Sequence, residues 1–126
     1  MITVEKDMVP FDIDQTLILH KKSSEICPLN LVRVKDTIAD RIICVEAHRP
    51  MIRLLEEEHA SGKYIVAWSR GGAKWAAAVI TALGLTDKVN LVLTKPLVYF
   101  DDKEANEWMQ NRVYIEPGTV YKGVGG

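Results

Sequence analysis

The sequence predicts an α/β protein built around a parallel β-sheet, and three observations indicate this class. Short apolar runs alternate with longer amphipathic stretches along the chain, which is the pattern of strands followed by crossover helices. Several of the apolar runs end in polar or acidic residues, as parallel strands do where a sheet edge holds a ligand. The length of 126 residues, with 48% hydrophobic and 26% charged residues, suits one domain with a sizeable core.

The N-terminal part is expected to hold a buried strand and a small hairpin. Residues 8–13 form an apolar run with acidic residues at its C-terminal end, which predicts a buried strand. The runs at 17–19, 29–34 and 41–45 predict shorter strands of a hairpin. We therefore expect an insert at about 20–47 that forms a β-hairpin flap beside the main sheet.

The central part predicts a helix, a strand and a second helix. Apolar side chains between Arg49 and Ala60 fall on one helix face, with Pro50 in the first turn and Gly62 after the last. The continuous β-rich run at 64–68 is typical of a strand that is covered on both faces. A second helix is expected at about 73–83.

The C-terminal part predicts three more strands and a short helix. The expected strands are 89–93, 97–100 and 113–115, and the expected helix is 103–111. The tail at 118–126 is rich in glycine and is expected to be flexible. Together these elements predict a three-layer, Rossmann-like parallel sheet with helices on both faces, in a single domain that covers 1–126.

Charge and cysteine content argue against several classes of protein. A net charge of −1 is unfavourable for coating nucleic acid or anionic membranes, because such binding needs a strong basic excess. Cys27 and Cys44 have no companion ligand at metal-site spacing, so the sequence indicates neither a zinc site nor a disulfide framework. No segment resembles a signal peptide or a membrane span. We therefore expect a cytoplasmic protein with both cysteines as small, buried or half-buried side chains and with no membrane partner.

Polar side chains follow four of the predicted strands, at the point where each strand ends. Because the carboxyl ends of parallel strands meet at one edge, these side chains are expected to converge on one crevice. Carboxylates crowded there repel one another unless a divalent cation lies among them, and oxygen ligands of this kind suit Mg²⁺. The residues, in chain order, are Asp12 and Asp14, Ser69, Lys95, and Asp101 with Asp102.

The same edge is expected to bind a phosphoryl group. The hydroxyl of Ser69, the ammonium of Lys95 and the backbone amides of the turn at Gly71 and Gly72 together form a receptor for phosphate oxygens. Arg70 either reaches a distal group of the substrate or remains an exposed charge.

These residues also have simpler structural interpretations. Ser69 is a good N-cap for the following helix, and Lys95 taken alone is a solvated loop lysine. Asp101 and Asp102 suit the N-terminus of the next helix, where the helix dipole favours acids.

Histidines and tryptophans outside this set are expected to be structural. Residues 20–22 form either a basic lip that attracts phosphate or a solvated hairpin turn. His48 and His59 are expected on the surface of the first helix. The three tryptophans are expected in the core rather than in a base-stacking platform: Trp68, Trp75 and Trp108.

Taken in order, the motifs resemble those of the haloacid dehalogenase-like (HAD) superfamily. The run Asp12-Ile13-Asp14-Gln15-Thr16 follows the first apolar strand, and Ser69, Lys95 and the aspartate pair at 101–102 follow later ones. The resemblance covers about residues 8–115. It implies a Rossmann-like fold, phosphatase chemistry and a Mg²⁺ cofactor.

The resemblance also implies a role for each matching residue. Asp12 matches the nucleophile that forms an aspartyl-phosphate. Asp14 matches the general acid and base, and Thr16 the hydroxyl that helps to position that acid. Ser69 and Lys95 match the groups that hold the phosphoryl oxygens. The implied magnesium ligands are the Asp12 carboxylate, the Asp14 backbone carbonyl, Asp101 and Asp102.

Three features of the resemblance bear on specificity. Asp14 favours phosphate monoesters, because dehalogenases, phosphonatases and P-type ATPases of the superfamily lack this aspartate. Many members have glycine where this chain has Gln15, so its bulky amide is expected to narrow the mouth of the site or to contact substrate. The spacings between Thr16, Ser69 and Lys95 leave no room for a helical cap domain. Such a capless site is open, and it is closed by the flap, a neighbouring subunit or a large substrate.

The predicted function is a Mg²⁺-dependent phosphomonoesterase that acts through a phosphoenzyme on Asp12. Its substrate is a small phosphorylated metabolite, a nucleotide or the phosphate at a polynucleotide end, and a homo-oligomer is compatible with the open site. A signalling receiver domain is disfavoured, because it would have its acidic pair early and its phosphoacceptor where this chain has Ser69. A non-catalytic binding or regulatory module with the same fold is the third hypothesis.

Overall fold

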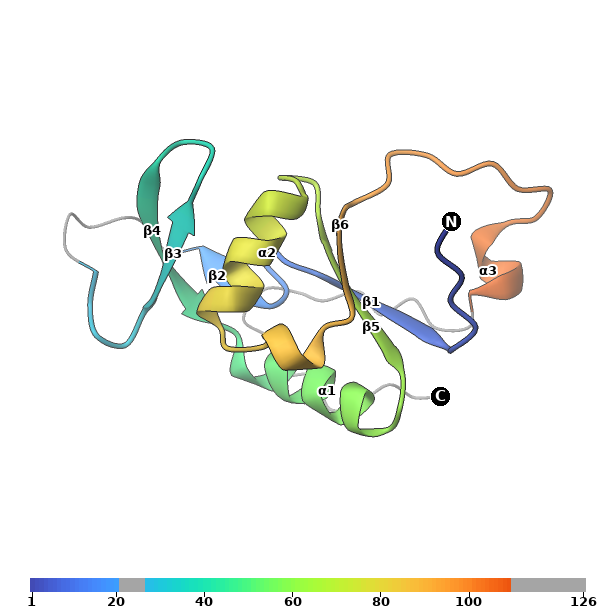
Figure 1. The fold of residues 1–126 in the computed structure, drawn as a ribbon, viewed down its shortest axis with the longest axis horizontal. Helices are drawn as coiled ribbons and strands as arrows, with labels where there is room; N and C mark the ends of the chain where they lie inside the picture. Colours follow the sequence, from blue (N-terminus) through green and yellow to red (C-terminus); the bar gives the residue numbers. More distant parts are fainter. Residues whose placement is uncertain (21–26, 110–126) are drawn as a thin grey trace.

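The most apolar runs of the sequence pair with one another in a three-stranded parallel sheet. The computed structural model describes residues 1–20 and 27–109. The sheet has the order β1-β5-β6, formed by β1 (Met8–Asp12), β5 (Tyr64–Ser69) and β6 (Leu91–Thr94). A second, antiparallel sheet has the order β2-β4-β3, formed by β2 (Ile18–His20), β3 (Val32–Asp36) and β4 (Arg41–Ala47). The described helices are α1 (Arg49–Ala60), α2 (Ala73–Ala82), the 3-10 turn η1 (Thr86–Lys88) and α3 (Ala105–Trp108), as Figure 1 shows.

The central strand β5 is buried, as its continuous apolar run predicts. Ile65, Val66 and Ala67 have no exposed surface, because β1 and β6 flank the strand and helices cover it. In the register, Asp12 lies opposite Trp68, and Ser69 lies opposite Thr94. The parallel register therefore brings the carboxyl ends of the three strands to one edge of the sheet.

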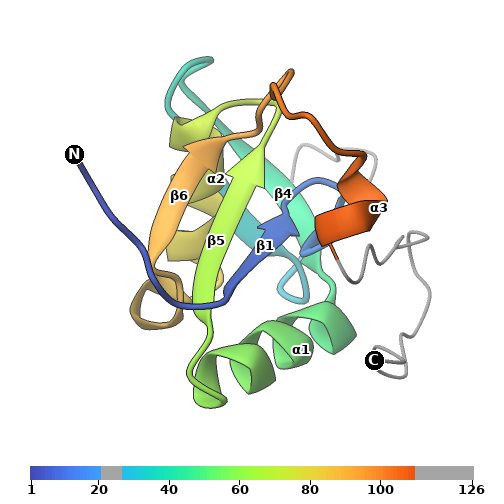
Figure 2. The ribbon, with the colours of Figure 1, turned by 90° about the vertical axis from the view of Figure 1, so that its right-hand side faces the viewer.

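Two amphipathic helices complete the α/β unit at the predicted positions. Helix α1 buries Met51, Ile52 and Leu55, and it contacts β5 and η1. Helix α2 buries its own apolar face and packs against β5, β6 and β3. Figure 2 shows α2 behind the parallel sheet. The predicted α/β class with a parallel sheet and helices is confirmed.

The hairpin expected between residues 20 and 47 is also present. Strands β3 and β4 pair in an antiparallel register, and β2 pairs with the other edge of β4. Val34 and Val45 of this sheet have no exposed surface, and β3 packs against α2. The small sheet is therefore part of the packed structure.

The two cysteines correct the expectation of free thiols. Cys27 and Cys44 form a disulfide, with their Cα atoms 5.7 Å apart. Cys44 lies on β4, and Cys27 precedes β3, the neighbour of β4 in the small sheet, so pairing of the strands brings the two close. Spacing along the chain could not reveal this contact, because the strand register creates it.

The segment after β6 differs most from the prediction. Residues 97–100 are not a strand, and their side chains are 55% to 94% exposed. β-rich composition produces a strand only where a sheet edge pairs with it, and within the described residues this segment pairs with none. Figure 1 shows the chain leaving β6 in a long excursion before α3.

The C-terminal predictions are met only in part. The helix expected at 103–111 is limited to Ala105–Trp108 in the described chain. Trp108 is 49% exposed rather than in the core, whereas Trp68 and Trp75 are half-buried. The strand predicted at 113–115 and the tail at 118–126 lie outside the described residues. Among the helices that the structure describes, none has the length and apolarity needed to cross a membrane.

Candidate active site

Three of the four predicted strand ends meet at the carboxyl edge of the parallel sheet. Asp12 ends β1, Ser69 ends β5, and Lys95 follows β6 directly. The Lys95 backbone N–H donates to the Ser69 carbonyl at 2.9 Å, which continues the β5–β6 ladder beyond Thr94. The predicted convergence of these residues is confirmed, and it follows from the parallel register.

A tight turn after β1 places two carboxylates beside each other. The backbone N–H groups of Thr16 and Leu17 donate to the Ile13 carbonyl at 3.2 and 3.0 Å. Ile13 and Leu17 have no exposed surface, so the turn is anchored in the core while Asp12 and Asp14 remain at the edge. The apolar residues of the motif therefore hold the chain, and the polar residues form the site.

Asp12 is a partly exposed carboxylate beside a lysine. Its side chain is 34% exposed, and its Oδ1 lies 3.8 Å from Lys95 Nζ. Burial raises the pKa of the Asp12 carboxyl above its ordinary value of 3.8; Lys95 opposes this effect, and the nearby Asp14 charge adds to it. The raised pKa makes Asp12 a more basic carboxylate than a solvated one.

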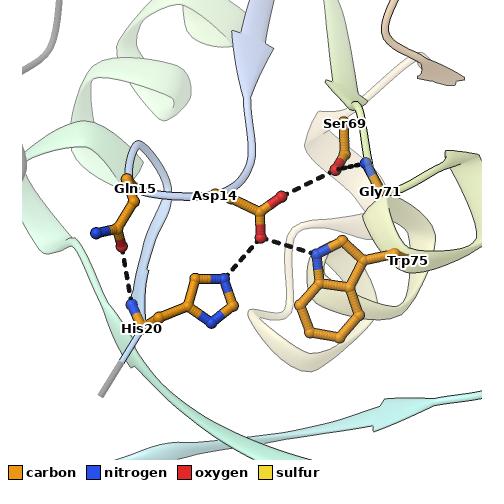
Figure 3. Close-up of polar contacts among 6 residues, drawn as sticks. All are labelled: Asp14, Gln15, His20, Ser69, Gly71 and Trp75. Atoms are coloured by element: carbon orange, nitrogen blue, oxygen red, sulfur yellow. Dashed lines mark hydrogen bonds and ion pairs between the residues drawn. The ribbon is translucent and has the colours of Figure 1, made fainter. Parts of the chain in front are cut away.

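Asp14 is held by three side-chain donors from three different elements (Figure 3). Its Oδ1 accepts from His20 Nε2 at 2.7 Å and from Trp75 Nε1 at 3.0 Å, and its Oδ2 accepts from Ser69 Oγ at 2.9 Å. Burial raises the pKa of this carboxyl, but the hydrogen bonds from His20, Trp75 and Ser69 outweigh burial and place the pKa below its ordinary value. Asp14 is therefore an oriented carboxylate.

The sequence predicts Trp75 in the core and His20 in a basic lip or a hairpin turn, whereas the structure places both side chains against Asp14. His20 ends β2, and Trp75 lies in the first turn of α2. Their rings are stacked, with centroids 6.3 Å apart and planes 19° apart. Helical and strand periodicity identify which residues face the core, but they do not show that two elements meet over one carboxylate.

Gln15 occupies a motif position whose backbone conformation favours glycine. Its φ of 62° lies in the left-handed region, which glycine adopts without the penalty of a Cβ atom. The Gln15 side chain does not extend over the site: its Oε1 accepts from the His20 backbone N–H at 3.0 Å (Figure 3). Gln15 is thereby tied to the start of the segment that carries His20.

Thr16 and His48 differ from their predicted roles. The Thr16 side chain acts on Asp12, the expected nucleophile, where it lowers the pKa of the carboxyl. His48 is 5% exposed instead of lying on the surface, and its Nδ1 donates to the Thr16 carbonyl at 2.8 Å. Both contacts secure the turn that presents the two aspartates.

The Ser69 hydroxyl and the Gly71 backbone N–H, which are predicted to bind phosphate, form hydrogen bonds within the protein. Ser69 is fully buried, and its Oγ also accepts from the Gly71 backbone N–H at 3.0 Å. A Cβ at Gly71 would lie 3.3 Å from both Ser69 Oγ and Trp75 Cδ1, so close packing favours glycine there. Arg70 is exposed at the surface. Lys95 is thus the predicted phosphate ligand whose charged group lies next to the proposed nucleophile.

Asp101 and Asp102 do not join the other aspartates. In the described part of the chain, no three histidine, cysteine, aspartate or glutamate residues form a group able to hold a metal. Asp101 instead accepts from the Lys103 backbone N–H at 3.1 Å in a turn that precedes α3, whose N-cap is Glu104. Asp12 and Asp14 offer the hard oxygens that suit Mg²⁺, and Asp101 and Asp102 are not grouped with them in the described structure.

A cleft with three basic residues in its lining lies between β3 and α2. It has a volume of about 500 Å³. Lys35 pairs with Asp40 at 2.9 Å, whereas Arg33 and Lys74 have no ion-pair partner among the residues that the structure describes. The residues that line it include three cations and no acid: Arg33, Lys35, Thr37, Lys74, Ala77, Ala78, Thr81 and Ala82.

Comparison with known proteins adds no relative to this description. The chain matches no family model, no curated protein and no solved structure. The functional conclusions below therefore depend on the residues and their geometry.

Proposed function

We propose that this protein is a phosphomonoesterase of the HAD type that forms an aspartyl-phosphate on Asp12. The observation that supports this most is the pairing of an accessible Asp12 carboxylate with Lys95 at 3.8 Å, beside an oriented second carboxylate on Asp14. The Rossmann-like three-layer arrangement belongs to the same proposal, as do Mg²⁺ as cofactor and a phosphorylated small molecule or nucleotide as substrate.

In the first half-reaction, an oxygen of Asp12 attacks phosphorus, and the bond from phosphorus to the leaving oxygen breaks. Lys95 offsets the charge on the phosphoryl oxygens during this transfer. Asp14, in its protonated form, gives its proton to the leaving oxygen, which departs as an alcohol. In the second half-reaction, ionised Asp14 takes a proton from water as that water attacks phosphorus. Inorganic phosphate leaves, and the Asp12 carboxylate is restored.

The lowered pKa of Asp14 has a consequence for these two steps. Near neutral pH the carboxyl is mostly ionised, which suits the base that activates water. Protonation of a poor leaving group needs the scarcer acid form. Substrates with good leaving groups are therefore expected to react faster in the first half-reaction.

Hydrolysis of p-nitrophenyl phosphate by the intact protein and by Asp12→Asn tests this proposal. The assay is run with Mg²⁺ and with excess chelator. Turnover that needs the metal and disappears in Asp12→Asn is the expected result. Turnover that persists in Asp12→Asn would contradict the role of Asp12, and no turnover with any phosphate monoester would favour the non-catalytic module.

We also propose a cytoplasmic location. The disulfide removes one argument for it, namely the expectation of reduced cysteines. The expectation depended on free thiols, whereas the structure joins Cys27 and Cys44. Rapid alkylation of thiols in intact cells, followed by mass spectrometry, measures the state of the pair. Alkylated cysteines would support a reducing compartment, and an intact disulfide would oppose it.

A second candidate function, a phosphatase for polynucleotide ends, is favoured by the cleft between β3 and α2. Its three cations, with no acid in the lining, complement a phosphodiester backbone. The cleft follows α2, whose first turn holds Trp75 against Asp14. A nucleic acid in the cleft would therefore have a terminal phosphate close to the site.

The charge reversal Lys74→Glu tests this candidate. With a phosphorylated oligonucleotide it is expected to raise KM at least about 10-fold, with a weaker dependence of KM on salt. With p-nitrophenyl phosphate the same variant is expected to be unchanged. An unchanged KM for the oligonucleotide would contradict this candidate and leave small phosphate monoesters as the substrate class.

A further inference from the structure

We propose that His20 and Trp75 are positioning residues that fix the Asp14 carboxylate through Oδ1, so that Oδ2 is the oxygen that exchanges the proton with leaving group and water. This inference rests on the proposed function and deepens it. It assigns the proton transfer to one atom of the site.

The hydrogen bonds to Asp14 are distributed unequally between its two oxygens. A carboxylate offers about four acceptor positions, two on each oxygen. His20 at 2.7 Å and Trp75 at 3.0 Å use both positions on Oδ1. Ser69 Oγ, at 2.9 Å, uses one position on Oδ2. The remaining acceptor position is therefore on Oδ2.

The direction of each hydrogen bond follows from the chemistry of the donors. Indole Nε1–H of Trp75 can only donate, so it holds an acceptor oxygen at all times. Because a carboxylate accepts, His20 Nε2 holds the proton in its bond to Oδ1. The two donors approach one oxygen from stacked rings, which fixes the plane of the carboxylate as well as its position.

His20 is itself held in place by the backbone of the turn. Its N–H donates to Gln15 Oε1 at 3.0 Å, and its residue pairs with Val45 in the β2–β4 ladder. Trp75 is fixed by α2, whose neighbouring residue Ala76 is fully buried. Both donors thus come from ordered elements, which is what accurate positioning of a catalytic group requires.

Dependence on the leaving group separates a positioning role from a general structural one. Transfer to Asp12 needs the acid when an alkoxide leaves, but hardly when p-nitrophenolate leaves. The measured quantity is kcat/KM, which reports the first half-reaction. It is determined for an alkyl phosphate and for p-nitrophenyl phosphate. The parent protein is compared with His20→Ala, His20→Gln and Trp75→Phe.

The expected result is a selective loss. His20→Ala is expected to lower kcat/KM for the alkyl phosphate about 10-fold or more and that for p-nitrophenyl phosphate less than about 3-fold, a part of the usual contribution of a general acid. The loss is expected because the misplaced Asp14 carboxyl outweighs the larger acid fraction that follows when the hydrogen bond lowering its pKa is removed. His20→Gln, which keeps a donor near the Nε2 position, is expected to recover most of the loss. Trp75→Phe, which removes only the N–H, is expected to show the same selectivity as His20→Ala.

Arg41→Ala provides the matched control. It removes an exposed side chain and its ion pair with Asp36 from β4, in the same small sheet that contains His20, outside the cleft lining and at a distance from Asp12 and Asp14 along the chain. This variant is expected to leave both substrates unchanged, and a urea unfolding curve for each variant confirms that it is folded.

Two results would overturn the inference. Equal losses with both substrates in folded His20→Ala, or no loss with either, would show that His20 does not position the acid. Failure of the proposed function gives a different result, namely no turnover of either substrate by the parent protein. The positioning role alone is refuted if the parent turns over both substrates and His20→Ala keeps the parent's ratio of kcat/KM between the alkyl phosphate and p-nitrophenyl phosphate.

Discussion

Replacement of Gln15 by glycine and by alanine tests whether the turn between the two aspartates is held in a left-handed conformation. Gln15 is exposed and has a φ of 62°, so neither change leaves a cavity. The left-handed conformation costs a residue with a Cβ about 1–2 kcal/mol, and glycine avoids this cost. Glycine loses about 0.5–1 kcal/mol more backbone entropy on folding. Both variants lose the hydrogen bond to the His20 N–H, worth about 1 kcal/mol.

The difference between the two variants has a definite sign. Gln15→Gly is expected to be more stable than Gln15→Ala by about 0.5–1 kcal/mol, because the relief of the left-handed conformation exceeds the entropy cost. Gln15→Ala is expected to lose about 1 kcal/mol relative to the parent protein, since it keeps the strain and loses the bond. Urea unfolding followed by circular dichroism measures both values.

Arg53, an exposed position in the middle of α1, serves as the matched control. There the helix favours alanine over glycine by about 1 kcal/mol, which is the opposite sign. If alanine is as stable as glycine at position 15, or more stable, the left-handed turn and the explanation of this motif position are wrong.

Three further predictions concern the site and the disulfide. Lys95→Met is expected to move the acid limb of the pH–rate profile for p-nitrophenyl phosphate to higher pH, because Lys95 lowers the pKa of the nucleophile Asp12. Asp14 has a lowered pKa in the folded state, so it stabilises the protein above its unfolded pKa and loses this contribution as pH falls through the folded pKa. Asp14→Asn should therefore flatten the acid side of the stability–pH curve, measured by thermal unfolding, and a curve parallel to that of the parent would contradict this. Cys44→Ser is expected to lower the free energy of unfolding by about 3 kcal/mol, as expected for a loop of this size, and a reductant should change the parent by a similar amount and the variant not at all.

Strongly periodic segments were predictable from the sequence. The helix at Arg49–Ala60 and the strand from Tyr64 follow from local patterns of apolar residues, and the structure places both where the sequence does. The convergence of Asp12, Ser69 and Lys95 was also predictable, because the carboxyl ends of parallel strands share an edge whatever the details of packing.

Contacts between elements were beyond the reach of these patterns. The apolar run at 97–100 predicts a strand, yet strand formation needs a free edge in register, which composition does not specify. The hydrogen bond of Trp75 to Asp14 joins residues that are distant along the chain, and its meeting with His20 over one carboxylate depends on how the small sheet packs against α2. The disulfide of Cys44 depends on the strand register within the small sheet. Single-sequence periodicity contains neither property.

The most direct test of the account is to identify the phosphorylated residue during turnover. The protein is mixed with p-nitrophenyl phosphate, quenched in acid within the first turnovers, digested and examined by mass spectrometry. We expect the added mass of one phosphoryl group on the peptide that contains Asp12, with none in Asp12→Asn. A phosphoryl group on another residue, or turnover by the parent protein with no trapped phosphopeptide, would contradict the central claim.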